Sequence, residues 1–348
     1  MPEIKLKSIQ NKLKARKIEC FLVCDPMDLF YLTGIDLQGG YWIVVTAKKA
    51  TIITSEMLYQ QVSDLLPGFE AVKSRKFIET LKTILKTEKI KVLTIDPKKM
   101  SLGLGDKLQK AIKKVKYVSV FFESLREIKT ENEILLIKKS CNSAVNVFNE
   151  IRKEIKPGMT EIYIADRIME LLYKNGTGAA FTPIVAGGIN SGYPHHINSE
   201  YAIKNNDLLI IDLGARLKGY CSDLTRTVIL GKIPELCDKV YNLVKLAHNE
   251  AIAAVKPGIK ASFVDKKARF LINKEGFGKE FTHGTGHGVG LEVHELPSVN
   301  STGNAILKPG MVITVEPGIY IKNNFGARME DTVLVTENGR EILTRGAK

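Results

Sequence analysis

The tetrapeptide Lys-Pro-Gly-Met at residues 156–159 returns as Lys-Pro-Gly-Ile at residues 256–259, an offset of 100 residues. Each copy is followed by apolar residues at helical spacing. The two helical patterns have matching lengths because they end at Asn175-Gly176 and at Glu275-Gly276. Two similar halves of this kind predict a pseudo-twofold domain with its functional site between the halves.

The similarity of the halves extends into two strand patterns, each with an acid at its end. Residues 208–214 (LLIIDLG) resemble residues 311–318 (MVITVEPG), and residues 222–228 (SDLTRTV) resemble residues 329–333 (MEDTV) across a short gap. The matching places three pairs of polar residues in equivalent positions: Asp212 with Glu316, Asp223 with Glu330, and His195 with His294. We therefore expect each half to supply one acid at a strand end and a second acid across a hairpin.

A single acid at a strand end is more often a surface residue of the following turn. Its repetition in both halves favours a shared site instead, because a buried carboxylate is costly unless it is paired or bound to a cation. Four converging carboxylates would repel one another, and two divalent cations with a bridging hydroxide would neutralise most of that charge. Oxygen-rich ligation with one imidazole suits manganese or cobalt more than a thiolate-binding metal. We expect manganese, with cobalt or zinc as alternatives.

Five of the six histidines lie in two short segments, His195 and His196 in one, and His283, His287 and His294 in the other. His287 stands inside Gly-Thr-Gly-His-Gly-Val-Gly at residues 284–290, which resembles a dinucleotide-binding loop. However, no strand precedes it within a βαβ unit, and residues 291–294 look extended rather than helical. A glycine-flanked imidazole is better suited to meeting a metal.

The sixth histidine, His248, lies in a helical pattern where we expect a structural role. Rival chemistries have little support, because the chain has no Gly-x-Ser-x-Gly elbow and no His-Glu-x-x-His pattern. The five cysteines are odd in number and scattered, and none has a setting that indicates a nucleophile.

The composition bounds the class of protein. With 348 residues, 44% of them apolar, the chain is long enough for two buried cores. The scattered cysteines and the lack of an apolar leader or membrane-length segment predict a cytoplasmic protein without membrane association. The net charge of +13 raises the alternative of nucleic-acid binding. We do not expect it, because the lysines are spread over amphipathic segments without interleaved aromatic residues.

The first third of the chain has a different pattern from the repeat. Strand-like runs alternate with helical patterns up to residue 122, and they predict a small α/β domain without catalytic residues. The predicted strands are residues 20–24, 41–45, 51–53 and 92–95. A long helix with a capping box at Thr130 and Glu133 then opens the second domain. We predict a division into residues 1–124 and 125–348.

Five motifs occur in order and at consistent spacing: residues 211–214 (IDLG), 222–227 (SDLTRT), 283–295, 316–320 (EPGIY) and 328–332 (RMEDT). Together they resemble the proline-specific peptidases aminopeptidase P and prolidase, over essentially the whole chain. The resemblance implies an N-terminal α/β domain of the creatinase type (ribonuclease H-like), an α+β pita-bread domain that binds two metals, and a homodimer. It also implies hydrolysis of the bond between an N-terminal residue and a following proline.

Matching positions imply roles for individual residues. Among the metal ligands, Asp212 would bind one ion, His287 and Glu316 the other, and Asp223 and Glu330 both. The substrate and catalytic residues implied in the same way are His195 and His294 at the scissile carbonyl, Glu330 as proton carrier, Arg328 beside Glu330, and His283, Phe181 and Ile184 at the proline pocket. His196 stands where relatives often have glycine or tyrosine.

Two further functions remain as alternatives. A methionine aminopeptidase shares the fold and ligands, but the large N-terminal domain and the form of residues 328–332 argue against it. A non-catalytic protein-binding module of the same fold typically loses metal ligands, whereas all five are present here. The sequence leaves open the choice between dipeptides and longer peptides as substrates.

Overall fold

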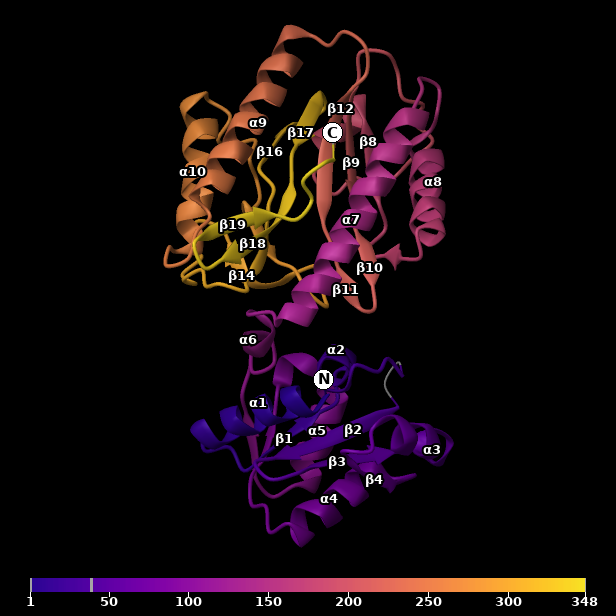
Figure 1. The fold of residues 1–348 in the computed structure, drawn as a ribbon, viewed down its shortest axis with the longest axis vertical. Helices are drawn as coiled ribbons and strands as arrows, with labels where there is room; N and C mark the ends of the chain where they lie inside the picture. Colours follow the sequence, from indigo (N-terminus) through magenta and orange to yellow (C-terminus); the bar gives the residue numbers. More distant parts are fainter. Residues whose placement is uncertain (1, 38–39, 348) are drawn as a thin grey trace. The chain divides into compact units, whose positions relative to one another are not determined.

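The computed structural model describes residues 2–37 and 40–347 and divides into two compact units, Met1–Leu125 and Arg126–Lys348 (Figure 1). Each unit is described here by itself.

The first unit is built on a six-stranded sheet in the order β4-β3-β2-β1-β5-β6. Its strands are β1 (Cys20–Val23), β2 (Tyr41–Thr46), β3 (Ala50–Thr54), β4 (Glu70–Lys73), β5 (Leu93–Ile95) and β6 (Val115–Tyr117). Its helices are α1 (Pro2–Ala15), α2 (Pro26–Thr33), α3 (Glu56–Leu65), α4 (Phe77–Thr87), the 3-10 helix η1 (Pro97–Lys99) and α5 (Leu102–Ala111), and α6 (Glu123–Arg126) follows. The four predicted strands are confirmed within one residue at each end. The edge strands β4 and β6 lack a buried apolar run, so the sequence does not predict them.

The second unit pairs two long helices and a set of strands in each half. Its helices are α7 (Glu131–Glu154), α8 (Glu161–Lys174), the 3-10 helix η2 (Gly188–Gly192), α9 (Glu235–Ala254) and α10 (Ala261–Lys274). The strands of the first half are β7 (Gly178–Ala179), β8 (Ile184–Gly187), β9 (Leu208–Leu213), β10 (Ala215–Leu217), β11 (Tyr220–Cys221) and β12 (Leu224–Ile229). Those of the second half are β13 (Gly286–Gly288), β14 (Glu295–Val299), β15 (Val312–Val315), β16 (Gly318–Ile321), β17 (Phe325–Arg328), β18 (Asp331–Thr336) and β19 (Gly339–Ile342).

Local sequence signals explain where these helices begin. Thr130 caps α7, and the side chain of Glu133 returns to the backbone N–H of Thr130, which confirms the predicted capping box. In the repeated tetrapeptides, Gly158 and Gly258 both have positive φ, +93° and +86°, a conformation that favours glycine. Their N–H groups donate to the carbonyls of Ile203 and Leu307 at 2.8 and 2.9 Å, so the two loops are equivalent.

The pseudo-twofold repeat extends to the cores. One cluster of buried apolar side chains joins α7 and α8 to β8 and β9, and a second joins α9 and α10 to β15 and β18. Figure 1 shows the two helix pairs on opposite sides of the strands of this unit. At the seam between the halves, β12 of the first half lies against β17 and β18 of the second. The polar residues of the site lie on or next to the strands of both halves.

Candidate metal centre and active site

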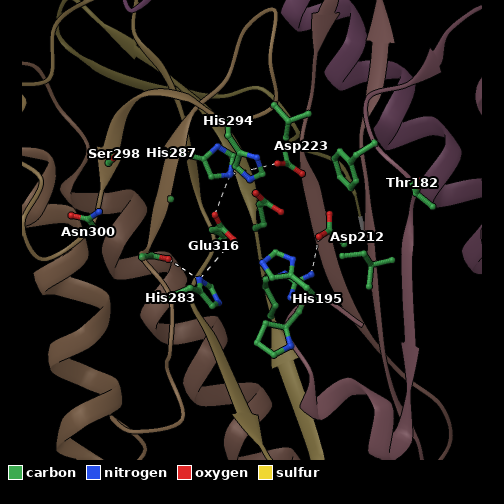
Figure 2. A pocket seen from close by; sticks show the side chains of 18 residues that line it. Thr182, His195, Asp212, Asp223, His283, His287, His294, Ser298, Asn300 and Glu316 are labelled. Atoms are coloured by element: carbon green, nitrogen blue, oxygen red, sulfur yellow. Dashed lines mark hydrogen bonds and ion pairs between the residues drawn. The ribbon is translucent and has the colours of Figure 1, made fainter. Parts of the chain in front are cut away.

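A cavity of about 570 Å³ opens in the second unit at the seam between its halves. All the side chains proposed from the sequence for metal, substrate and catalysis line it: Phe181, Ile184, His195, Asp212, Asp223, His283, His287, His294, Glu316, Arg328 and Glu330. Figure 2 shows how the labelled acids and histidines converge from both halves. The volume is large enough for a small peptide.

Strand pairing positions the acids of the first half. Asp212 on β9 lies between Ile184 on β8 and Thr225 on β12 in the register of the three-stranded sheet. Asp223 directly precedes β12, and its carbonyl accepts a 2.7 Å hydrogen bond from the hydroxyl of Thr332 on β18. Asp223 is therefore tied to the second half.

The acids of the second half are placed by bonds across the same seam. The N–H of Glu330 donates to the carbonyl of Thr225 at 3.0 Å, and the hydroxyl of Thr227 donates to the carbonyl of Arg328 at 2.8 Å. Glu316 directly follows β15, and its N–H donates to the carbonyl of Thr285. The bonds of Glu330 and Arg328 cross the seam and join residues more than 100 positions apart, whereas the bond of Glu316 lies within the second half.

Asp223, His287 and Glu330 each offer one ligand atom, and these atoms lie within 4.8 Å of one another. Glu316 joins them through its Oε1, which is 3.2 Å from Nε2 of His287. Asp212 lines the same cavity from the other side of the seam and pairs with Arg328 at 2.8 Å. The structure thus brings all five predicted ligands into one cavity, three of them within mutual ligand distance.

Burial and crowding shift the pKa values of these acids. Burial raises the pKa of Asp223 well above its ordinary value, and the neighbouring Glu330 carboxylate adds to the shift. Burial also raises the pKa of Glu330, with further contributions from Glu316 and Asp212. Carboxylates that are this crowded ionise together only when cations neutralise them.

His287 and Glu316 behave as an ion pair. Burial acts to raise the pKa of Glu316, but the hydrogen bond and charge of His287, together with the charges of His283 and Arg328, lower that pKa to about 2. Burial acts to lower the pKa of His287, but Glu316, the carbonyl of Gly288 and the charge of Asp212 together raise the imidazole pKa. A metal would replace the imidazole proton between these two groups.

The donor set fits divalent cations. Oδ1 of Asp212 and Oε1 of Glu330 are buried and have no hydrogen-bond partner within residues 2–37 and 40–347. Buried carboxylate oxygens without partners are costly, and coordination would satisfy them. Four carboxylates with one imidazole are the ligands that manganese, cobalt and related ions accept.

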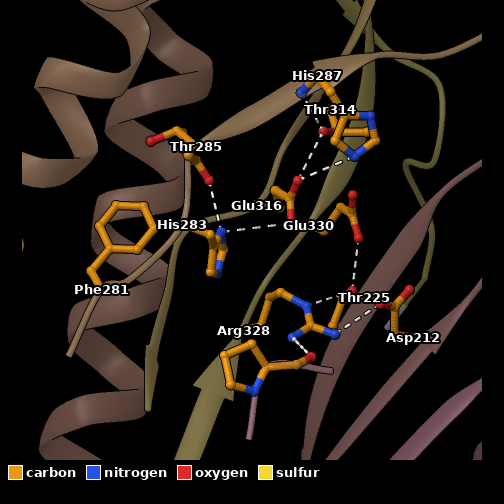
Figure 3. Close-up of polar contacts among 12 residues, drawn as sticks. Asp212, Thr225, Phe281, His283, Thr285, His287, Thr314, Glu316, Arg328 and Glu330 are labelled. Atoms are coloured by element: carbon orange, nitrogen blue, oxygen red, sulfur yellow. Dashed lines mark hydrogen bonds and ion pairs between the residues drawn. The ribbon is translucent and has the colours of Figure 1, made fainter. Parts of the chain in front are cut away.

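Arg328 is buried and makes four polar contacts within the cavity wall. Figure 3 shows its contacts with Thr225 and Asp212. Its guanidinium donates to Oγ1 of Thr225, the carbonyl of Pro194, the hydroxyl of Tyr320 and Oδ2 of Asp212, at 3.1, 3.1, 2.8 and 2.8 Å. The role predicted for Arg328 placed it beside Glu330. The structure shows that it pairs with Asp212 and reaches Glu330 through Thr225, whose hydroxyl donates to Oε2 of Glu330 at 2.7 Å.

Thr225 and Tyr320 are two polar residues of the site that the sequence reasoning did not select. The hydroxyl of Tyr320 lies 2.9 Å from Nε2 of His283 and accepts from Arg328. Burial raises the pKa of Tyr320 to about 12, so the hydroxyl stays protonated. Thr225 lies in the motif at residues 222–227 and Tyr320 in the motif at residues 316–320. Their position in these motifs is the sequence feature that could have identified them as site residues.

The histidines differ in how firmly they are held. The ring of His294 contacts the ring of His287, with centroids 4.3 Å apart, and burial with the nearby His287 lowers the pKa of His294. His294 and His195 are both exposed to the cavity. The carbonyl of His283 accepts from Arg269, and burial lowers the pKa of its imidazole.

The remaining histidines and cysteines are structural. His248 is buried in α9 with Nε2 3.2 Å from Oδ2 of Asp331, and Nε2 of His196 lies 2.7 Å from the buried carboxylate of Glu161. Neither histidine lines the large cavity. All five cysteines are free, and burial raises the pKa values of Cys20 and Cys221 to about 12, against a role as nucleophile.

Residues 291–294, which the sequence predicts as extended, form bends between β13 and β14. They are not helical, as expected. In the described part of the chain, no helix is long and apolar enough to cross a membrane.

The carboxylate and imidazole cluster at the base of a peptide-sized cavity is that of a metal-dependent hydrolase. The sequence matches Metallopeptidase family M24 over residues 136–337 and the Creatinase/Prolidase N-terminal domain over residues 5–128. The chain therefore belongs to metallopeptidase family M24, a family that uses divalent metals. The fold class and the family resemblance predicted from the sequence are confirmed.

Individual relatives resemble the chain over nearly its whole length. The Xaa-Pro dipeptidase of Pyrococcus furiosus is 36% identical over 98% of this chain and 97% of its own. The structure of an Xaa-Pro dipeptidase from Bacillus anthracis aligns with a TM-score of 0.95 at 31% identity, covering 99% of this chain and 98% of that one. An X-Pro aminopeptidase from Thermotoga maritima aligns with a TM-score of 0.85 at 31% identity, covering 95% and 97%.

Proposed function

We propose that this protein is a metal-dependent exopeptidase that hydrolyses the bond between an N-terminal residue and a following proline. The observation that carries the proposal is the cluster of Asp223, His287 and Glu330 at the base of the cavity, with Glu316 and Asp212 beside it. Relatives at 31–36% identity that are named Xaa-Pro peptidases support the substrate class. These relatives do not favour the methionine aminopeptidase and binding-module alternatives.

Two ions, manganese in our proposal, are assigned to the five ligands. Asp212 would hold one ion, His287 and Glu316 the other, and Asp223 and Glu330 both. When bound, such ions lower the pKa of a water molecule so that it is a nucleophile at neutral pH. The unpartnered buried oxygens of Asp212 and Glu330 support this assignment.

The histidines that face the cavity are assigned to the scissile carbonyl. His294 and His195 would donate hydrogen bonds to the oxygen that gains negative charge during attack, an interaction commonly worth a few kcal/mol. Contact with His287 on one side limits where the ring of His294 can turn. Arg328 is assigned a positioning role, since its donors are occupied by Thr225, Pro194, Tyr320 and Asp212.

Proton transfer is assigned to Glu330. A carboxylate beside the attacking water can take a proton from it and give it up again. The acceptor would be the proline nitrogen, which leaves as a secondary amine. The hydroxyl of Thr225 donates to Oε2 of Glu330 and holds this carboxylate in place.

Recognition of the substrate is assigned to the walls of the cavity. His283, Phe181 and Ile184 would contact the proline ring, with His283 held in place by Tyr320 and Arg269. The free amine of the substrate would lie near the acidic metal ligands. This contact would limit cleavage to the N-terminal bond of the peptide substrate.

We also propose a domain division at residues 1–124 and 125–348, a homodimer, and a cytoplasmic location. The compact units and the matched family ranges support the division. The five free cysteines support a reducing compartment. The resemblance to prolidases is the support for the dimer, and the molar mass in solution tests it.

The test of function is an assay with manganese on Ala-Pro, Ala-Pro-Ala, Ala-Ala-Ala and Met-Ala-Ser. We expect cleavage of the proline substrates and little of the others, and loss of all cleavage in an Asp223→Ala control. Preferred cleavage of Met-Ala-Ser, or no peptidase activity after manganese is added, would contradict the proposal.

A further inference from the structure

The segment that carries His294 into the cavity, residues 289–294, is a loop of bends between β13 and β14. Backbone hydrogen bonds join the start of this loop to the neighbouring strands. The N–H of Val289 donates to the carbonyl of Val312, and the carbonyl of Gly290 accepts from the N–H of Cys221 at 2.7 Å. Beyond Gly290, the position of His294 depends on how the backbone of residues 291–294 is held.

Glu295, the residue that follows His294, holds this backbone through hydrogen bonds to its carboxylate. Its Oε1 accepts hydrogen bonds from the N–H groups of Leu291 at 2.9 Å and Glu292 at 3.1 Å. The carboxylate folds back against Gly290, where any side chain would collide with it. The side chain of Glu295 is 2% exposed, so these are buried charge-assisted bonds.

Two buried cations contact the same carboxylate. Nε of Arg126 lies 3.3 Å from Oε1 of Glu295, and Nζ of Lys129 lies 3.3 Å from Oε2. The side chains of Arg126 and Lys129 are 3% and 2% exposed. Arg126 also contacts Glu292, whose carboxylate is partly exposed. Both 3.3 Å contacts join opposite charges, so charge attraction helps to hold the carboxylate of Glu295.

The two cations are themselves fixed to the body of the second unit. The N–H of Lys129 donates to the carbonyl of Gly310 at 2.9 Å, and Ile128 forms a β-bridge with Met311 just before β15. The segment at residues 126–129 is thus anchored to the sheet that carries Glu316. A continuous path of contacts runs from this sheet through Lys129 and Glu295 to the loop of His294.

We propose that Glu295 is a positioning residue for catalysis. Its carboxylate is held by Arg126 and Lys129 and binds the backbone of the loop at residues 289–294, so that the imidazole of His294 faces the scissile carbonyl. Glu295 does not line the cavity itself. The activity readout of this proposal rests on the proposed peptidase function, whereas its structural readout does not.

The test is Glu295→Gln, which keeps the size of the side chain and one acceptor oxygen but removes the charge between the two cations. We expect kcat on Ala-Pro-Ala to fall about 10- to 100-fold, the range typical for supports of catalytic groups, with little change in KM. The metal content should equal that of the wild type. Glu295→Asp, which keeps the charge on a shorter side chain, should recover part of kcat.

The structural readout is amide hydrogen exchange of a peptide spanning residues 289–294. We expect faster exchange in Glu295→Gln, because Leu291 and Glu292 lose a charged acceptor. The matched control is Glu292→Gln in the same loop, since the carboxylate of Glu292 is partly exposed and contacts Arg126. It should change both kcat and exchange much less.

Three results would overturn the proposal: wild-type kcat and exchange in Glu295→Gln, loss of metal in parallel with activity, or an equal effect of Glu292→Gln. If Glu295→Gln does not fold, Lys129→Met takes its place, because it leaves the carboxylate and removes one of its anchors. A fall in kcat with faster loop exchange then supports the proposal, and no change contradicts it. If the wild type cleaves no proline peptide, the proposed function fails while the exchange result still decides the role of Glu295.

Discussion

Nη2 of Arg328 donates a 2.8 Å hydrogen bond to Oδ2 of Asp212, and the two residues come from opposite halves of the repeat. The side chains are 4% and 14% exposed, so the pair is largely removed from water. Burial raises the pKa of Asp212, and Arg328 offsets part of that shift. The pair shows how the seam between the halves stabilises a charged ligand.

Arg328→Met should destabilise the protein by about 3–5 kcal/mol after chelation of metal, because it leaves the carboxylate of Asp212 buried without a cation. The loss should be smaller with manganese present, which would neutralise Asp212. Urea unfolding with and without the ion measures both values. As a control, Arg75→Met removes an exposed ion pair with Glu56 and should cost at most about 1 kcal/mol. Equal losses in the two variants would refute the argument.

Asp223→Ala and His294→Ala should separate metal binding from catalysis. Asp223 lies within ligand distance of His287 and Glu330, so its removal should abolish metal binding and activity together. His294→Ala should keep the metal and lower kcat by about 10²–10³, the cost of losing a donor to the developing oxyanion. Metal analysis and steady-state kinetics on the same samples provide the comparison. Full turnover in His294→Ala would show that its assigned role is wrong.

Thr225→Val should lower kcat while preserving the fold. The hydroxyl of Thr225 donates to Glu330 and accepts from Arg328, and valine has the same shape without either bond. Removing a support of this kind typically costs 10–100-fold in activity or metal affinity. Thr336→Val, at the far end of β18, is the control and should leave kcat unchanged. An unchanged kcat in Thr225→Val would exclude Thr225 from the network.

Stabilisation by metal should increase with pH between about 5 and 8. The pKa values of Asp223 and Glu330 are raised in the fold, so without metal their protonated forms contribute stability below about pH 4, the unfolded value. That contribution is lost as pH rises through the raised folded values. At the higher pH these carboxylates are already deprotonated, so metal binds them without displacing a proton and stabilises the fold more.

The measurement is the difference in Tm with and without manganese at pH 5, 6.5 and 8. Glu316 acts in the opposite sense, because its lowered pKa contributes stability that is lost as pH falls towards 2, outside this range. A Tm difference that is constant, or that shrinks as pH rises, would contradict the prediction.

Much of the fold could be predicted because its signals are local. The repeated tetrapeptides, the capping box at Thr130 and the apolar runs that end at Asp212 and Glu316 each lie within a few residues of the element that they specify. The site could be predicted because Asp212 and Asp223 of the first half have equivalents in Glu316 and Glu330 of the second, a repetition that can be read along the sequence.

The sequence by itself determined the pseudo-twofold repeat and the set of acids and histidines, since periodicity and motif spacing are written along the chain. The tertiary structure decided which groups meet. Thr225 bonds Glu330 across 105 positions, and Glu295 meets Arg126 and Lys129 across the unit. Such contacts depend on how strands from the two halves pack at the seam, and no local pattern encodes the distance between atoms brought together by that packing.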